Sequence, residues 1–321
     1  MPEISIILPL YNAGKHLLPC LETLQKQVFR DFEVIIVDDA STDGSLDTAL
    51  HFAAADRRFR IIQNKVNQHI GLCRNIGLQA ATGIYIGFSD HDDLHHPEMY
   101  QRLHDKAVRT QADIVMSLPC TTLQGDDSNI AHFPQVTDCR QFCLHDLLSN
   151  GGHERYNSLF NTIHGNLYKR SLLVDHHLSF VDTRYITPED KIFQLAAILA
   201  ATRVEWVDSV LYIHNNHDSN AGSVSTYQSV YTRGAGLQEM YNILKINGVL
   251  CTYKEDFYLG AAKQLIRIMS ETMLRHPLKI KKIRKQLRAL SLCAEAMRYA
   301  PPSARHGFKR LFRKLIIVLL Q

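Results

Sequence analysis

The chain has 321 residues, of which 45% are hydrophobic and 21% charged, a composition that supports a sizeable core and argues against disorder. Its net charge of +4 conceals an asymmetry, because residues 275–321 contain thirteen Lys and Arg against one Glu. That segment therefore has a net charge of +12 and residues 1–274 have −8. The length fits one large α/β domain or two smaller ones.

The N-terminus and the cysteines both indicate a cytoplasmic protein. Met1 leads directly into "EISIILPLYN", which lacks a basic region and breaks at Pro9, so it is typical of a first core strand rather than a signal peptide. The seven cysteines are scattered without C-x-x-C pairs, which excludes the usual zinc spacing and favours a reducing compartment.

The first ninety residues alternate between short apolar runs and segments with helical spacing. The runs lie at residues 4–8, 33–37, 59–63 and 84–88, and the helical segments at 14–27, 44–56 and 70–82. Continuous apolar runs rich in β-branched or aromatic residues suit strands buried on both faces. The alternation predicts βαβ units and an α/β fold with a mostly parallel sheet.

Beyond Asp93 the pattern becomes less regular. It predicts a helix from Pro97 to 108, a strand over 112–118, loops around one helix to about residue 158, helices over 166–175 and 188–201, two short strands over 203–207 and 210–214, and helices from 226 onward.

Five carboxylates follow two of the predicted strands. Asp38 and Asp39 come after the second strand, and Asp90, Asp92 and Asp93 after the fourth. Ligands bind at the carboxyl ends of strands in an open α/β sheet, and clustered carboxylates repel one another unless a cation compensates. Oxygen ligands select Mg²⁺ or Mn²⁺, which complete their coordination with phosphates and water. The structural alternative is a solvated acidic turn, because D-x-D occurs by chance in many loops.

The sequence lacks the two common phosphate-binding loops. No G-x-G-x-x-G follows the first strand and no G-x-x-x-x-G-K-[ST] occurs, which argues against a dinucleotide fold and a P-loop. A phosphate-containing ligand would therefore be held by a metal rather than by a glycine cradle.

Four segments together resemble the family 2 glycosyltransferases of GT-A fold. They are "SIILPLYNAGKHLLPCLETLQKQVFRDFEVIIVDDASTDGS", "NQHIGLCRNIGLQAATGIYIGFSDHDD", "NTIHGNLYKRSLL" and "LSFVDTRYITPEDKIF", and the resemblance spans about residues 3–215. It implies an inverting transfer of a sugar from a nucleotide diphosphate sugar, usually a UDP-sugar, to an acceptor hydroxyl.

The resemblance also implies roles for individual residues. Pro9, Tyr11, Asn12 and Asp39, with Asp38 beside them, would hold the uracil and ribose; Arg74 would contact the base or phosphate; Asp90 and Asp92 would form the D-x-D, with Asp92 the direct ligand of Mn²⁺ or Mg²⁺; Asp190, with Glu189 beside it, would be the catalytic base.

The chemistry of the reaction agrees with these roles. A metal stabilises the diphosphate that leaves, and one carboxylate on the opposite face takes the proton of the attacking hydroxyl. Each role has a structural alternative. Asp190 follows Pro188 and could serve only the helix dipole, and Arg74 could pair with any nearby carboxylate.

The histidines near the aspartates have two interpretations. His91, His95 and His96 could extend the metal site, but solvated loop histidines are commoner. His214 or His217 of "YIHNNHDSNAGSVS" could approach the metal or the diphosphate.

The basic C-terminus predicts contact with a membrane surface. Residues 279–290 and 307–321 interleave cations with apolar residues at helical spacing, and the final run "LIIVLL" is too short to span a bilayer. Nucleic acid is disfavoured as a partner, because the tail has few aromatic residues and the remainder of the chain is acidic. The alternative is a helical bundle that packs on the body.

These observations define an expected organisation. Residues 1–220 would form the GT-A catalytic domain, with a nucleotide-sugar half to residue 110 and an acceptor half from 111, and residues 221–321 a basic helical region. The enzyme would work in the bacterial cytoplasm at the inner face of the membrane, on lipopolysaccharide or capsule glycans or glycolipids. Rival hypotheses are a nucleotidyltransferase acting on sugar phosphates and a non-catalytic sugar- or lipid-binding module.

Overall fold

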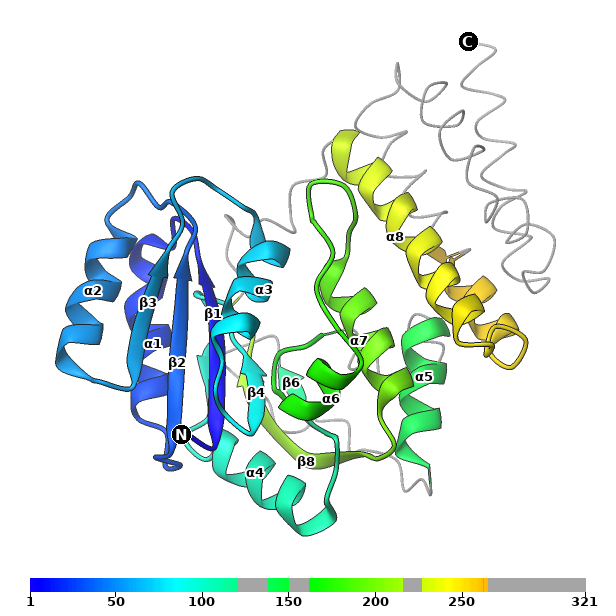
Figure 1. The fold of residues 1–321 in the computed structure, drawn as a ribbon, viewed down its shortest axis with the longest axis horizontal. Helices are drawn as coiled ribbons and strands as arrows, with labels where there is room; N and C mark the ends of the chain where they lie inside the picture. Colours follow the sequence, from blue (N-terminus) through cyan, green and yellow to red (C-terminus); the bar gives the residue numbers. More distant parts are fainter. Residues whose placement is uncertain (121–137, 150–161, 216–226, 262, 265–321) are drawn as a thin grey trace.

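The computed structural model describes residues 1–120, 138–149, 162–215, 227–261 and 263–264, and it contains one mixed sheet of eight strands (Figure 1). The spatial order is β3-β2-β1-β4-β7-β6-β8-β5. The strands are β1 (Ile4–Leu10), β2 (Phe32–Asp38), β3 (Phe59–Gln63), β4 (Tyr85–Phe88), β5 (Leu94–His95), β6 (Ile114–Cys120), β7 (Asn166–Lys169) and β8 (Val204–Ile213). All described strands except β5 and β7 run in one direction, so the expected mostly parallel α/β sheet is confirmed.

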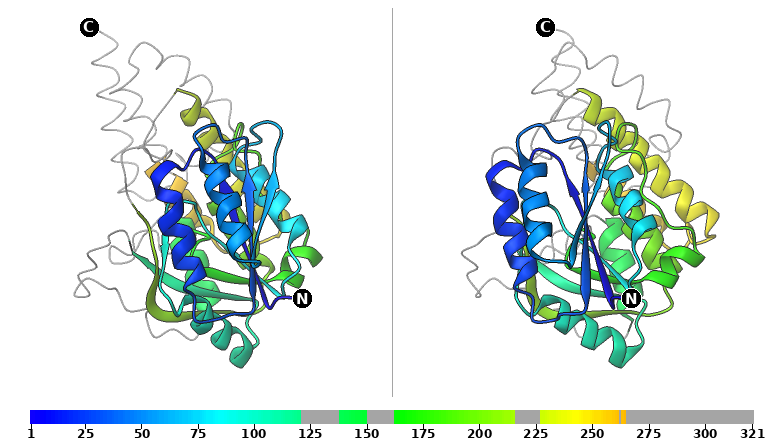
Figure 2. Two further views of the ribbon diagram at one scale, coloured as in Figure 1. Left: turned by 90° about the vertical axis from the view of Figure 1, so that its left-hand side faces the viewer. Right: turned by 60° about the vertical axis from the view of Figure 1, so that its left-hand side comes forward.

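Helices cover both faces of the parallel part of the sheet (Figure 2). They are η1 (Gly14–His16), α1 (Leu17–Gln25), α2 (Ser45–Ala55), α3 (Ile70–Ala80), α4 (Met99–Thr110), α5 (Cys139–Ser149), α6 (Arg170–Asp175), α7 (Glu189–Ala200) and α8 (Tyr227–Ile246). Alternate residues of β1 enter opposite cores: Ile6 packs with α1, and Ile7 packs in the core that contains Cys73 of α3. Burial on both faces explains why this strand is apolar throughout.

Two predictions from the sequence were wrong in detail. Residues 166–169 form strand β7 rather than the start of a helix, and β7 pairs antiparallel with both β4 and β6. The two strands expected over 203–214 are one strand, β8. In both cases the pairing partner is distant in the chain, so local spacing did not reveal it.

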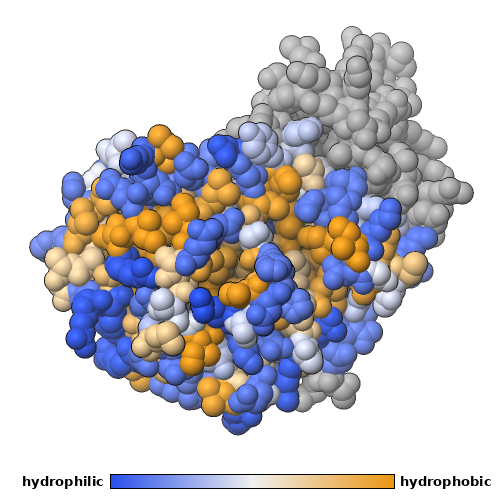
Figure 3. Space-filling model, in the orientation of Figure 1, coloured by the Kyte–Doolittle hydropathy of each residue, from blue (hydrophilic) through white to orange (hydrophobic). Residues whose placement is uncertain are grey.

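The C-terminal part of the described chain packs against the rest through α8 and a further helix that includes residues 254–261. No helix in the described ranges is long and apolar enough to cross a membrane. The basic segments 279–290 and 307–321 lie outside the described residues, as does His217. In the space-filling view, apolar patches across the middle of the visible face are surrounded by polar side chains (Figure 3).

Candidate active site

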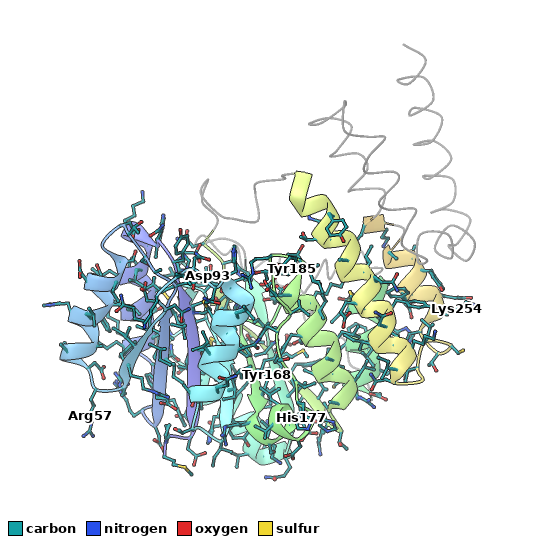
Figure 4. All side chains as sticks on the ribbon, turned by 45° about the horizontal axis from the view of Figure 1, so that its top comes forward. Arg57, Asp93, Tyr168, His177, Tyr185 and Lys254 are labelled. Carbon is teal, nitrogen blue, oxygen red and sulfur yellow. The ribbon has the colours of Figure 1, made fainter. Side chains whose placement is uncertain are left out.

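The candidate site lies where β1, β2 and β4 end at the same edge of the sheet. Asp39 follows β2, and its backbone N–H donates to the carbonyl of Leu10 at the end of β1 at 2.8 Å. Asp90 follows β4, two residues beyond Phe88. Figure 4 shows Asp93 at this edge, with the loop that contains Tyr185 nearby. The expected convergence of carboxylates at one sheet edge is therefore present.

Arg74 lies at the centre of the site and joins two carboxylates that are distant in the sequence. It comes from α3, and its side chain is only 2% exposed. Nη2 donates to Oδ1 of Asp90 at 3.0 Å and Nη1 donates to Oε1 of Glu189 at 2.7 Å. The guanidinium also lies over the ring of Phe180, 5.3 Å from its centroid. Arg74 therefore connects the loop after β4 to the start of α7.

His164 is a second side chain in contact with Asp90. Its Nε2 lies 3.1 Å from Oδ1 of Asp90, and its Nδ1 lies 2.9 Å from the hydroxyl of Thr162. Its ring stacks on Tyr212 with centroids 5.4 Å apart. Although burial opposes the charged form of Asp90, His164 and Arg74 hold the pKa of its carboxyl well below the usual value. Asp90 is consequently an anion at neutral pH.

Asp93 links the same loop to the end of β8 through hydrogen bonds. Its Oδ2 accepts from the hydroxyl of Tyr212 at 2.7 Å and from Nδ1 of His214 at 3.1 Å, and its Oδ1 accepts from the backbone N–H of Asn215 at 2.9 Å. The same Tyr212 oxygen accepts from the N–H of Asp90 at 3.1 Å. Asp93 thus fixes the end of β8 against the carboxylate loop, and His214 is engaged with it.

The other loop histidines lie in separate environments. His95 is buried with its Nδ1 3.1 Å from the hydroxyl of Thr23, and burial lowers the pKa of His95 to about 3. His96 accepts from the N–H of Glu98 through Nδ1, and Nδ1 of His91 lies 3.3 Å from the carbonyl of Pro9. These contacts favour structural roles for His95 and His96.

A divalent metal fits the donor set only if a ligand supplies most of its coordination. Within the described ranges, no group of three or more His, Cys, Asp and Glu side chains is arranged to hold a metal. Asp90, however, uses Oδ1 for both Arg74 and His164, and no described residue hydrogen-bonds its Oδ2. Asp92 lies two residues on, half-buried. Mg²⁺ and Mn²⁺ are commonly bound by two carboxylates together with diphosphate oxygens and water.

Asp190 occupies the first turn of α7, next to Glu189. Its Oδ1 accepts from the N–H of Lys191 at 2.8 Å. Burial raises the pKa of Asp190 to about 6, the negative charge of Glu189 adds to the rise, and Arg74 opposes it. Asp190 is therefore mostly ionised at neutral pH, yet it is far more basic than an exposed aspartate, as a general base needs.

The residues predicted to bind the nucleotide mostly hold loops in place. Asp39 is buried, and its carboxylate accepts from Nδ2 of Asn64 at 2.9 Å and from the N–H groups of Gln68 and His69 at 2.6 and 2.8 Å. Oδ1 of Asn12 accepts from the N–H of Thr42 at 2.8 Å. These contacts shape the edge at which a nucleotide would bind.

Three other residues that were predicted to bind the nucleotide differ in their exposure to solvent. Asp38 is fully buried, and its Oδ2 has no hydrogen-bond partner among the described residues. Pro9 is buried within β1, whereas Tyr11 is 46% exposed beyond the strand end. Of these three residues, Tyr11 is the most accessible to a base. Contact of any of these residues with a nucleotide stays a prediction.

The profile of the family described as glycosyl transferase family 2 matches residues 5–175, slightly more than half of the chain. The chain belongs to glycosyl transferase family 2. As a member of this family it is a glycosyltransferase, and the resemblance seen in its sequence is confirmed.

A curated relative covers nearly the whole chain. The uncharacterized glycosyltransferase EpsJ of Bacillus subtilis (strain 168) is 29% identical over 308 residues, which are 94% of this chain and 88% of EpsJ. The similarity therefore extends beyond the segment that the family profile matches.

Solved structures confirm the GT-A type of fold. The crystal structure of S. aureus TarS 1–349 in complex with UDP-GlcNAc has a TM-score of 0.65 at 18% identity and covers 96% of this chain and 92% of that one. The mannosyltransferase PcManGT from Pyrobaculum calidifontis, in complex with GDP-Man and Mn²⁺, has a TM-score of 0.57 at 15% identity, with coverages of 99% and 86%. At these identities the likeness concerns the fold.

Sequence reasoning missed His164 and the structural role of Asp93. His164 stands in the quoted segment "NTIHGNLYKRSLL", but nothing local shows that a buried ring there would reach Asp90, 74 residues earlier. For Asp93 the signal was available in part, because three adjacent carboxylates exceed what one D-x-D pair requires. The three polar partners of Asp93 lie in β8 or directly after it. The sequence pattern predicted two short strands in place of β8.

Proposed function

We propose that this glycosyltransferase transfers a sugar from a UDP-sugar to a hydroxyl of a glycan or glycolipid acceptor with inversion, and that it depends on Mn²⁺ or Mg²⁺. The observation that carries the proposal is the bridge that Arg74 forms between Asp90 and Glu189. It joins the loop of Asp90 to the start of α7, where Asp190 lies, and this connection supports a shared site. The UDP-GlcNAc and GDP-Man complexes of the structural neighbours support a nucleotide sugar as donor.

Each carboxylate has a separate task in this proposal. Asp92 and Oδ2 of Asp90 would hold the metal, which when bound neutralises charge on the departing diphosphate. Arg74 and His164 orient Asp90 and keep it ionised. Glu189 holds Arg74 and raises the basicity of its neighbour, so it acts as a positioning residue.

Asp190 is the proposed catalytic base. Its pKa of about 6 leaves it ionised at neutral pH and able to accept the proton of the acceptor hydroxyl as that oxygen attacks the anomeric carbon. The bond from that carbon to the diphosphate oxygen breaks on the opposite face, which inverts the configuration.

The acceptor and location are also proposals. A role in bacterial lipopolysaccharide or capsule synthesis at the inner face of the cytoplasmic membrane is supported by the +12 charge of residues 275–321, which suits anionic lipid rather than nucleic acid. Sedimentation of the full chain with anionic but not with zwitterionic vesicles would support this location. Equal sedimentation with both would contradict it.

Thermal stabilisation by UDP separates the donor and acceptor tasks. A ligand that binds only the native state raises its stability. We expect UDP with Mn²⁺ to stabilise the wild type, EDTA to remove that effect, and Asp92→Asn to lose it. Asp190→Asn should keep UDP binding but lose transfer of sugar from UDP-sugars.

The matched control is Asp175→Asn, which removes an exposed carboxylate on α6. It should behave as the wild type in both assays. If Asp190→Asn and Asp92→Asn lose UDP binding equally, the division of tasks is wrong. If UDP stabilises the wild type equally with EDTA, the metal is not part of the site.

A further inference from the structure

The loop between Phe180 and Pro188 rises beside the first turns of α8, at the top of Figure 1. Its start is firmly held. The side chain of Asn75 on α3 donates to the carbonyl of Phe180 at 2.9 Å and accepts from its N–H at 2.8 Å. The Phe180 ring stacks on Phe193 of α7, with centroids 4.1 Å apart. Two helices therefore fix the point where the loop begins.

The end of the loop is held by α8. The N–H of Thr187 donates to the carbonyl of Thr232 at 3.0 Å, and the two hydroxyls lie 2.8 Å apart. Gly236 allows this approach, because a Cβ at that position would lie 2.0 Å from the carbonyl oxygen of Thr187. These contacts fix the position of Thr187, and therefore the start of α7, where Asp190 lies.

The tip of the loop is also ordered by its own contacts. The carboxylate of Asp182 accepts from Nε and Nη2 of Arg184, and its carbonyl accepts from the N–H groups of Tyr185 and Ile186 at 3.0 and 3.1 Å. On the side towards α3, Thr183 packs near Gly71. This loop is preorganised, which reduces the ordering cost of binding a ligand to it.

Tyr185 nevertheless presents its ring to solvent. The residue is 61% exposed, more than Tyr11 or Tyr231, and the guanidinium carbon of Arg184 lies over the ring at 5.7 Å from its centroid. Figure 4 shows Tyr185 at the same edge of the molecule as Asp93. An exposed aromatic ring and an arginine on a rigid loop, five residues before a candidate base, have the composition of a ligand-binding surface.

We propose that Tyr185 and Arg184 form the subsite for a sugar ring of the acceptor. The inference rests on the proposed function and names the part of the acceptor that is recognised. The C–H groups on one face of a pyranose are apolar and pack on an aromatic ring, while its hydroxyls can accept hydrogen bonds from the guanidinium. The loop then places the acceptor hydroxyl towards Asp190 and leaves the nucleotide side, formed by Asp39 and Asn12, to the donor.

The test uses release of UDP by the full chain with Mn²⁺ and UDP-sugars. Methyl glycosides of glucose, galactose, mannose and N-acetylglucosamine serve as acceptor probes. We expect at least one glycoside to raise UDP release above the rate without acceptor. Tyr185→Ala should raise the half-saturating concentration of that glycoside by about tenfold, as expected for loss of an aromatic stack. The half-saturating concentration of the donor should change by less than twofold.

Two further variants separate this role from a structural one. Tyr185→Phe keeps the ring and should keep the half-saturating glycoside concentration. Ile246→Ala removes an 84% exposed apolar side chain at the other end of α8 and should change neither concentration. An unchanged glycoside concentration in Tyr185→Ala overturns the inference, as does release of UDP that no glycoside stimulates. Absence of UDP release from every donor would instead count against the proposed function.

Discussion

The ionisation of Asp190 predicts how the rate of transfer depends on pH. If Asp190 is the base, only its ionised form is active, so kcat/KM should rise with pH through about 6 and level off above 7. At pH 5, one unit below the pKa, about one molecule in eleven has the ionised carboxylate, so the rate should be about tenfold below the plateau. The slope is positive because protonation removes the base.

The neighbour of Asp190 provides a way to move this profile. The negative charge of Glu189 helps to raise the pKa of Asp190, whereas Arg74 lowers it. Glu189→Gln removes this negative charge but keeps an amide oxygen that can accept from Arg74. The pKa of Asp190 should therefore fall, and the acidic limb of the profile should move to lower pH.

The assay is the initial rate of UDP release with an acceptor, measured from pH 4.5 to 8.5 at constant ionic strength. Asp175→Asn serves as the control and should reproduce the wild-type profile. A limb that persists unchanged in the residual activity of Asp190→Asn would refute the assignment. So would a wild-type rate that is flat from pH 5 to 8.

Three other substitutions test the contacts around this base. Arg74→Met leaves Asp90 without its buried cation and should lower the free energy of unfolding by about 3 kcal/mol; an unchanged urea midpoint at pH 7.5 would contradict this. His164→Ala removes a support of the proposed metal ligand Asp90 and should weaken Mn²⁺-dependent UDP binding by about tenfold or more in calorimetry, and wild-type affinity would show that His164 only fills space. Gly236→Ala should lower both kcat and the melting temperature, because the new Cβ collides with Thr187; a melting temperature raised by the better helix propensity of Ala would contradict the contact.

Much of the fold could be predicted from local pattern, because β1 and β2 are apolar throughout and lie buried on both faces. Strand β7 could not, since its four residues continue directly into α6 and its pairing with β4 and β6 spans long sequence separations. A short segment of this kind takes its structure from its neighbours.

The candidate site likewise has a part that the sequence predicts and a part that only the structure shows. Asp90, Asp92 and Asp190 could be named as candidates from their spacing and the family resemblance, and their roles stay predictions. The link between them was not, because Arg74 and Glu189 are 115 residues apart and only the folded chain shows that they touch. The family resemblance implies that Arg74 contacts the base or phosphate, which stays a prediction; the structure adds that its buried guanidinium pairs with Asp90 and Glu189.

The bridge through Arg74 limits how pieces of this enzyme could be recombined with those of relatives. A chimera that joins a donor-binding segment from one protein to an acceptor-binding segment from another would separate the origins of Arg74 and Glu189. If the incoming α7 lacked a carboxylate at that position, the buried Nη1 of Arg74 would lose its partner, although Nη2 would keep Asp90. Exchanges designed to alter the acceptor should therefore retain Glu189 and vary the solvent-facing tip of the preceding loop, where a new side chain alters recognition without disturbing the junction.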